Sequence, residues 1–160
     1  MLSVKLICVG KMRERFYIDA FEEYRKRLGA YCRFECVEIA EQRLGDDPSQ
    51  AQIDASLEKE GAEILRAIPP DAYVAALCVE GRQSSSEEFS SLFKERADSG
   101  KPKLCFLIGG SFGLAESVKA RADLRLSMSK MTFPHHLARV MLAEQIYRAF
   151  KIGEGSRYHK

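Results

Sequence analysis

A glycine-rich segment carries the first side chain in the sequence that could act as a nucleophile. Gly109-Gly110-Ser111-Phe112-Gly113 follows an apolar run and fits the pattern G-x-S-x-G. After a strand and before a helix, this pattern is typical of a serine nucleophile on a sharp turn. One aspartate and three histidines follow in the order that α/β-hydrolases use. These residues are Asp123, His135, His136 and His159. A small serine hydrolase is therefore one interpretation.

The same glycines favour a second interpretation, in which the main chain approaches a bound ligand. Glycine has no Cβ, so backbone amides can come close to a molecule at the carboxyl end of a parallel strand. The sequence contains neither a G-x-G-x-x-G dinucleotide fingerprint nor a Walker A lysine. A tight turn that binds nothing is the third possibility.

Basic residues gather at the C-terminal end of the chain. Residues 127–160 contain six lysines and arginines, only two acids, and all three histidines. The last four residues, Arg157-Tyr158-His159-Lys160, combine two cations, an aromatic ring and an imidazole. Positive charge beside a possible acid or base suits a site for an anionic substrate. The alternatives are a basic surface without a partner and a terminal histidine that is simply frayed.

Strands and helices are expected to alternate along the chain. Apolar runs predict strands over 3–9, 33–39, 72–79, 103–108 and 124–127. Helical spacing predicts helices over 16–28, 53–68, from the serines at 84–86 to Gly100, after Gly113 to about 122, and over 134–151. Because the strands are continuously apolar, the pattern favours an α/β fold with a parallel sheet flanked by helices.

The last expected helix is apolar on two opposite sides. One face includes Val140, Met141, Glu144 and Arg148, and the other is formed by 142, 146, 149 and 150. A surface helix normally has a single apolar stripe, so the second stripe needs its own cover. A twin subunit could supply that cover, and a crowded core is the alternative. Glu144 and Arg148 have the i,i+4 spacing of a structural ion pair.

Length and composition indicate one globular domain over residues 1–160. Hydrophobic residues make up 46% and charged residues 30%, which argues against a disordered chain. The longest apolar run has eight residues, too short for a membrane span, and the start reads as a strand and not as a signal peptide. Five cysteines with no zinc-site spacing favour reduced thiols, a cytoplasmic protein and no metal.

Several long motifs give the sequence a family resemblance. They are 107–114 (LIGGSFGL), 126–135 (LSMSKMTFPH), Arg139-Val140, 144–149 (EQIYRA) and the terminal Tyr158-His159-Lys160. Together with the start at 9–11 (VGK), they resemble the ribosomal RNA large subunit methyltransferase H family. That family is a small branch of the SPOUT, or trefoil-knot, methyltransferases. The resemblance covers essentially the whole chain.

The resemblance implies an enzyme that uses S-adenosylmethionine (SAM) to methylate N3 of a pseudouridine in helix 69 of 23S rRNA, within the large subunit or the assembled ribosome. It also implies a deep C-terminal trefoil knot and a homodimer. The family's cofactor contacts fall on Leu77, Gly109, Gly110, Met128, Ser129, Lys130, Met131, Thr132 and Phe133. Its catalytic tail falls on Arg157, Tyr158 and His159, and RNA contacts are expected at His135, Arg139 and Lys160.

Methyl transfer from a sulfonium donor fits these residue types. The donor already carries an activated methyl group, so Ser111 need not be a nucleophile, and the protein must mainly align donor and acceptor. The imide proton of the acceptor must leave, and His159 could take or orient it. Two positions depart from the family pattern: Phe112, where small or polar residues are common, and Arg157, where proline or alanine is frequent. A non-catalytic RNA-binding module is the remaining class.

Overall fold

In the computed structural model, which describes residues 1–160, five parallel strands form one sheet in the order β2-β1-β4-β3-β5. The strands are β1 (Ser3–Val9), β2 (Arg33–Ile39), β3 (Tyr73–Gln83), β4 (Lys103–Ile108) and β5 (Leu124–Ser127). The central strand β4 is buried except at its first residue, because helices cover both of its sides. This arrangement confirms the predicted α/β class with a parallel sheet.

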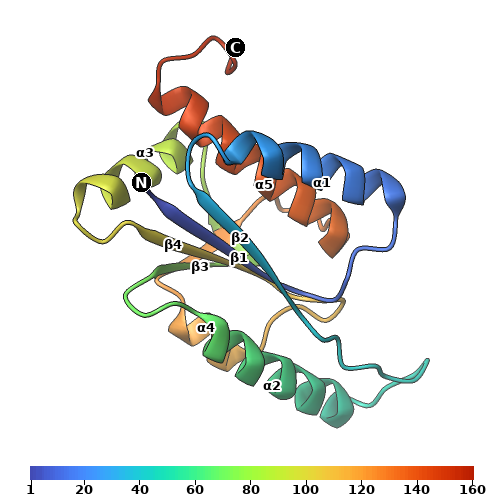
Figure 1. Ribbon diagram of the computed structural model, residues 1–160. Helices are drawn as coiled ribbons and strands as arrows, with labels where there is room; N and C mark the ends of the chain where they lie inside the picture. The colour runs from blue at the N-terminus through green and yellow to red at the C-terminus, as the bar shows by residue number, and fades with distance from the viewer.

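Five helices lie on the two faces of the sheet (Figure 1). They are α1 (Arg15–Leu28), α2 (Gln50–Ala67), α3 (Ser86–Asp98), α4 (Glu116–Arg121) and α5 (His135–Gly153). Ser49 and Ser85 begin α2 and α3 with capping boxes, in which each serine accepts from an N3 backbone amide. Helix α2 therefore starts three residues before the predicted 53–68.

Two apolar cores result from this layering. Helices α1, α3 and α5 cover one face around Leu6, Phe106 and Ile146. Helices α2 and α4 cover the other face around Ile7, Leu107 and Val118. Alternate residues of β1 and β4 therefore point into different cores, as the two-residue period of a strand requires. No helix combines the length and the apolar character needed to cross a bilayer.

Strand β3 continues beyond the point where the sequence predicted its end. The sequence predicted a strand over 72–79, but β3 runs through Gly81 to Gln83 and pairs with β5 across a register shift. A Cβ on Gly81 would lie 2.7 Å from the carbonyl carbon and oxygen of Arg125. The glycine therefore lets two backbones approach at an irregularity of the ladder, instead of terminating the strand.

Connections leave β1 and β4 toward opposite faces of the sheet. The helix after β1 is α1, on one face, and the helix after β4 is α4, on the other. Because β1 and β4 are neighbours, their carboxyl ends form a topological switch point, where open α/β sheets usually bind ligands. A ligand site is therefore expected among the segments that follow β1, β4 and their neighbours.

Helix α5 shows the two faces that its sequence predicted. Leu142, Ile146 and Ala149 are buried against the sheet, whereas Met141 on the other side is half-buried. Val140 is also half-buried and packs against the edge of the core with part of its surface. The five cysteines are all free thiols, as the sequence predicted, and Cys8, Cys32 and Cys105 are buried. Burial raises the pKa of Cys32 and of Cys105 to about 12, so both stay protonated at neutral pH.

Candidate functional site

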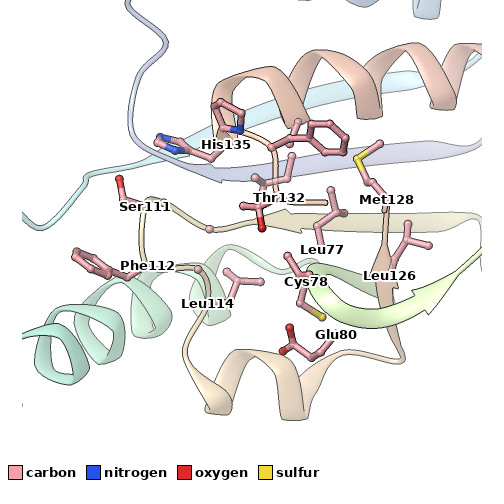
Figure 2. A pocket seen from close by; sticks show the side chains of 18 of the residues that line it. Leu77, Cys78, Glu80, Ser111, Phe112, Leu114, Leu126, Met128, Thr132 and His135 are labelled. Atoms are coloured by element: carbon pink, nitrogen blue, oxygen red, sulfur yellow. The ribbon is translucent and has the colours of Figure 1, made fainter. Parts of the chain in front are cut away.

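A cavity of about 690 Å³ lies at the carboxyl ends of β3, β4 and β5 (Figure 2). We call it the main cavity. Its walls are the end of β3, the turn that follows β4, and the segment from Met128 to His135 that leads into α5. About half of its lining residues are hydrophobic, a mixture typical of sites that hold a small organic molecule.

The turn after β4 forms one wall of the main cavity, and glycines stand at both ends of this turn. A Cβ on Gly109 would lie only 2.2 Å from the carbonyl oxygen of Gly113, so this position admits only glycine. Gly113 has a positive φ of 81°, which also favours glycine. Gly110 and Gly113 pair through an isolated bridge that closes the turn. The segment can therefore offer main-chain groups to a ligand.

An ion pair that sequence reasoning missed lies in the same cavity. Glu80 Oε1 accepts from Lys119 Nζ at 2.5 Å, and both residues line the wall. The pair lowers the pKa of Glu80 and raises that of Lys119, so both remain charged at neutral pH. Glu80 directly follows the apolar run of β3. Its place directly after the predicted strand 72–79 was the available signal, because ligands of parallel sheets bind at the carboxyl ends of the strands.

Most of the residues that the resemblance assigned to the cofactor do line the main cavity. Eight of the nine are there: Leu77, Gly109, Gly110, Met128, Ser129, Met131, Thr132 and Phe133. The ninth, Lys130, is exposed and does not line it. Ser129 Oγ accepts from the Met131 amide at 3.0 Å, which fixes this bend. Met131 is 74% exposed, so an apolar side chain at the rim is available to a ligand.

His135, expected on an RNA-binding surface, lies in the wall of the main cavity. Burial lowers the pKa of His135, and the neighbouring His136 lowers it further. The imidazole is therefore uncharged at neutral pH and can accept a proton. His136 is turned away, with Nδ1 2.9 Å from Glu14 Oε2.

Arg139 does not lie on a surface that could meet RNA. Its side chain is 2% exposed, and Nη1 donates to Glu38 Oε2 at 2.8 Å while Nη2 donates to the Gly10 carbonyl at 2.9 Å. It ties α5 to the carboxyl ends of β1 and β2. This corrects the expectation of an RNA contact, because a charged residue in an otherwise apolar helix can equally be a buried link.

The C-terminal tail folds back over α3 and α5, away from the main cavity of its own chain. Tyr158 donates to Glu144 at 3.1 Å, and His159 bridges Glu87 and Arg148. Burial and the Glu144 bond raise the pKa of Tyr158 to about 12. The predicted catalytic residues 157–159 and the exposed Lys160 are thus close to one another but do not line this chain's cavity.

The side chains that a serine hydrolase would need are not assembled. Ser111 is exposed, and no histidine or acid hydrogen bonds to it. Asp123 accepts from the Val74 amide at 2.8 Å, at the amino end of the sheet and so opposite the glycine turn.

The Glu144–Arg148 ion pair predicted from spacing is present, with Nη2 2.5 Å from Oε1. No group of three or more His, Cys, Asp or Glu side chains is placed to hold a metal ion.

Parallel strands whose carboxyl ends surround a cavity with a glycine turn in its wall define an α/β protein with a site for a small organic ligand. Comparison with known proteins makes this specific. Residues 2–159 match the family described as predicted SPOUT methyltransferase. The chain belongs to the SPOUT methyltransferase family.

Two similar proteins carry the same full-length match. The chain is 45% identical to the ribosomal RNA large subunit methyltransferase H of Clostridium beijerinckii, and 43% identical to that of Bacillus pumilus. Each match covers 99% of this chain and 100% of the relative.

Two solved structures share the fold at low sequence identity. One, from Bordetella pertussis and titled a probable methyltransferase, has a TM-score of 0.57 at 15% identity, over 92% of this chain and 96% of that one. The other, from Legionella pneumophila, is titled a methyltransferase in complex with bound SAM. It has a TM-score of 0.52 at 9% identity, over 93% of this chain and 66% of that one.

Proposed function

We propose that this protein transfers a methyl group from SAM to ribosomal RNA of the large subunit. The main cavity carries this proposal, because its base is a turn that requires glycine at positions 109 and 113 and its walls combine apolar and polar groups. Membership of the SPOUT methyltransferase family supports the reaction, and relatives named for large-subunit rRNA support the substrate.

The residues of the main cavity fit SAM. Leu77 and the exposed Met131 can contact an adenine ring, and the main chain at Gly109, Gly110 and Gly113 can approach polar edges because no Cβ stands in the way there. Glu80 can accept from ribose hydroxyls or the ammonium group while Lys119 holds it. Bound SAM supplies an activated methyl group, so this chain need only hold the acceptor in line with it.

The finer target is N3 of a pseudouridine in helix 69 of 23S rRNA, on the assembled ribosome or its large subunit, in the cytoplasm. N3 is an imide nitrogen, and its proton must leave as the methyl group arrives. In one chain, the neutral imidazole of His135 is a base in the cavity wall that, unlike Glu80, forms no ion pair. The tail residues Arg157, Tyr158 and His159 lie outside this wall. A tail role therefore requires the cavity of a partner in a homodimer.

The homodimer and the deep C-terminal knot belong to the same proposal. The half-buried face of α5, with Val140 and Met141, supports a second subunit there. Lys160 and Lys130 are exposed cations that can contact RNA phosphates. Arg139 has no such role in the proposal, because its guanidinium is enclosed.

The test measures SAM binding and methyl transfer separately. Calorimetry should show SAM binding to the wild type, and labelled SAM should transfer its methyl group to ribosomes, with the product nucleoside identified by mass spectrometry. Gly109→Ala should weaken SAM binding about 10- to 100-fold, because its Cβ cannot fit beside Gly113. Gly153→Ala is the matched control, since its Cβ would meet nothing closer than 4.0 Å.

Each negative outcome points to a different class. RNA binding without methyl transfer would indicate a non-catalytic RNA-binding module. No SAM binding, with covalent labelling of Ser111 by a serine-reactive probe, would indicate the hydrolase.

A further inference from the structure

A second pocket of about 400 Å³ adjoins the main cavity on the other side of the glycine turn. We call it the side pocket. It is formed by the segments that follow β1, β2 and β4, together with α2. Ser111 and Phe112 line both cavities, so the turn is a shared wall. Figure 2 shows both side chains at the end of the main cavity opposite Met128. The side pocket therefore occupies the β1/β4 switch point, next to where SAM would bind.

Charges of both signs surround the side pocket without pairing one another. Arg13 and Arg43 contribute two cations, and Glu41 and Glu60 contribute two carboxylates. None of these four side chains takes part in an ion pair, whereas many other charged side chains at the surface do. Unpaired charges of both signs around one concave surface suit a ligand that offers both an anion and hydrogen-bond donors.

Glu60 is the unusual member of this set because it is 6% exposed. One of its oxygens, Oε2, accepts from the Gln42 amide at 2.9 Å, whereas Oε1 has no hydrogen-bond partner. Burial raises the pKa of Glu60, and the nearby Glu41 raises it further. A carboxylate that is poorly solvated gains strongly from a donor supplied by a ligand.

Phe112 gives the side pocket an aromatic rim. The ring is 50% exposed, on the turn that separates the two cavities. Exposed aromatic rings next to cations are typical of sites that stack an unpaired nucleobase and hold its phosphate. A base stacked on Phe112 would lie between the two cavities, within reach of both.

We infer that the side pocket receives the target nucleotide of the RNA, flipped out of its stack, with Phe112 stacking on the base, Arg13 and Arg43 on its phosphates, and Glu60 Oε1 accepting an N–H of the base. This inference rests on the function proposed above and adds the acceptor site to it. The proposed reaction methylates N3, which is an imide nitrogen, so the acceptor is a base with such a nitrogen. N3 must face the main cavity, because the methyl group of SAM lies there.

The position of Glu60 gives this site a means of selecting pseudouridine over uridine. In uridine, N1 is bonded to the ribose and carries no hydrogen. In pseudouridine the ribose is on C5, so N1–H is a second donor besides N3–H. With N3 directed at the main cavity, N1–H is the donor left for Glu60. A site built around such a donor rejects the analogue that lacks it.

The experiment compares side-pocket variants with matched controls on RNA that contains either pseudouridine or uridine at the target. Glu60→Gln keeps an oxygen for the Gln42 amide but turns an NH₂ group toward the base. It should lower kcat/KM on pseudouridine RNA about 10- to 100-fold and leave the slower rate on uridine RNA unchanged. Glu63→Ala, on the same helix and paired with Arg66 at the surface, is the control and should behave as wild type.

Variants of Phe112, Arg13 and Arg43 are tested by different kinetic and binding measurements. Phe112→Ala should lower kcat/KM about 10-fold or more on both RNAs, because stacking does not depend on N1. Arg13→Ala and Arg43→Ala should each raise KM for RNA and reduce the salt dependence of binding by about one unit of slope. Arg15→Ala, two residues away and mostly exposed, is the control for Arg13.

SAM affinity, measured by calorimetry, separates the possible failures. It should stay within about threefold of wild type in every side-pocket variant, whereas a large loss in Arg13→Ala or Arg43→Ala would show that the pocket holds part of SAM and would overturn the inference. Wild-type methyl transfer by all variants would also overturn it and leave the proposed function standing. Failure of the wild type to methylate any rRNA would refute the proposed function itself.

Discussion

Nε2 of His159 lies 2.7 Å from Oε1 of Glu87, which fastens the last but one residue of the chain to the first turn of α3. The other ring nitrogen, Nδ1, is 3.1 Å from Nη1 of Arg148. A guanidinium can only donate, so Nδ1 must accept and the ring proton lies on Nε2. Both nitrogens are therefore engaged, and the tail is held by its imidazole.

This relationship predicts that Glu87→Ala frees the tail. Amide hydrogen exchange of residues 156–160 should become faster, because His159 loses one of its two partners. Glu95→Ala removes an exposed acid from the same helix and is the control. Unchanged exchange in Glu87→Ala would mean that the Arg148–His159 and Tyr158–Glu144 contacts hold the tail without Glu87.

The strand and helix pattern was predictable because each element satisfies its own local rules. The strands are continuous apolar runs, and the spacing of Ser85 and Glu88 is that of a capping box. The extension of β3 was not predictable, because it depends on how closely Gly81 approaches Arg125 of another strand. Local patterns cannot reveal such a contact.

The candidate site was predictable in part, through the resemblance, for the segment 128–133 and the glycine turn. Glu80–Lys119 and Glu60 were missed because their roles depend on enclosure in three dimensions. Arg139 shows the opposite error. The resemblance led us to expect an RNA contact there, whereas packing between α5 and the sheet encloses the side chain.

Replacement of Ser111 distinguishes a transferase from a hydrolase. Ser111→Ala should lower methyl transfer by at most about tenfold, because the hydroxyl has no base beside it and only borders the cavities. Loss of a true serine nucleophile costs about 10⁶-fold. A fluorophosphonate probe should leave the wild type unlabelled, and stoichiometric labelling at this serine would reverse the assignment.

Charge on the outer face of α5 should disrupt a homodimer. Val140→Glu or Met141→Glu would place a carboxylate in an apolar contact, which should weaken association about 10²-fold or more. Sedimentation should then show monomers at micromolar concentration, with methyl transfer reduced in parallel. Ala51→Glu, on the exposed side of α2, is the control. A wild type that is a fully active monomer would contradict the dimer.

The buried imidazole of His135 should make stability depend on pH. Burial lowers the pKa of His135, so the unfolded chain takes up this proton at a higher pH than the folded chain. The contribution to the free energy of unfolding is complete above about pH 6.5 and is lost as the pH falls through the lowered pKa. His135→Gln should therefore lose less stability than wild type between about pH 7.5 and about pH 5.5, measured by urea unfolding. An equal loss in both proteins would show that the imidazole is not protected from protonation.

The tail gives the last prediction, because its residues lie outside the main cavity of their own chain. Deletion of 156–160 should change SAM affinity by less than about tenfold, since none of these residues lines the cavity. Methyl transfer to ribosomes should fall much further, by about 10²- to 10⁴-fold, if the tail acts on the acceptor base in a partner's cavity.

Single substitutions show which tail residue causes that loss. His159→Ala should reproduce most of it, whereas Lys160→Ala, at the exposed end, should mainly increase the salt sensitivity of RNA binding. Thermal unfolding of each variant separates a loss of activity from a loss of folding. The truncated chain should stay folded, because Glu144 keeps its bond to Arg148 when Tyr158 is removed. A truncated enzyme that turns over at the wild-type rate on saturating ribosomes would leave His135, already in the cavity wall, as the base.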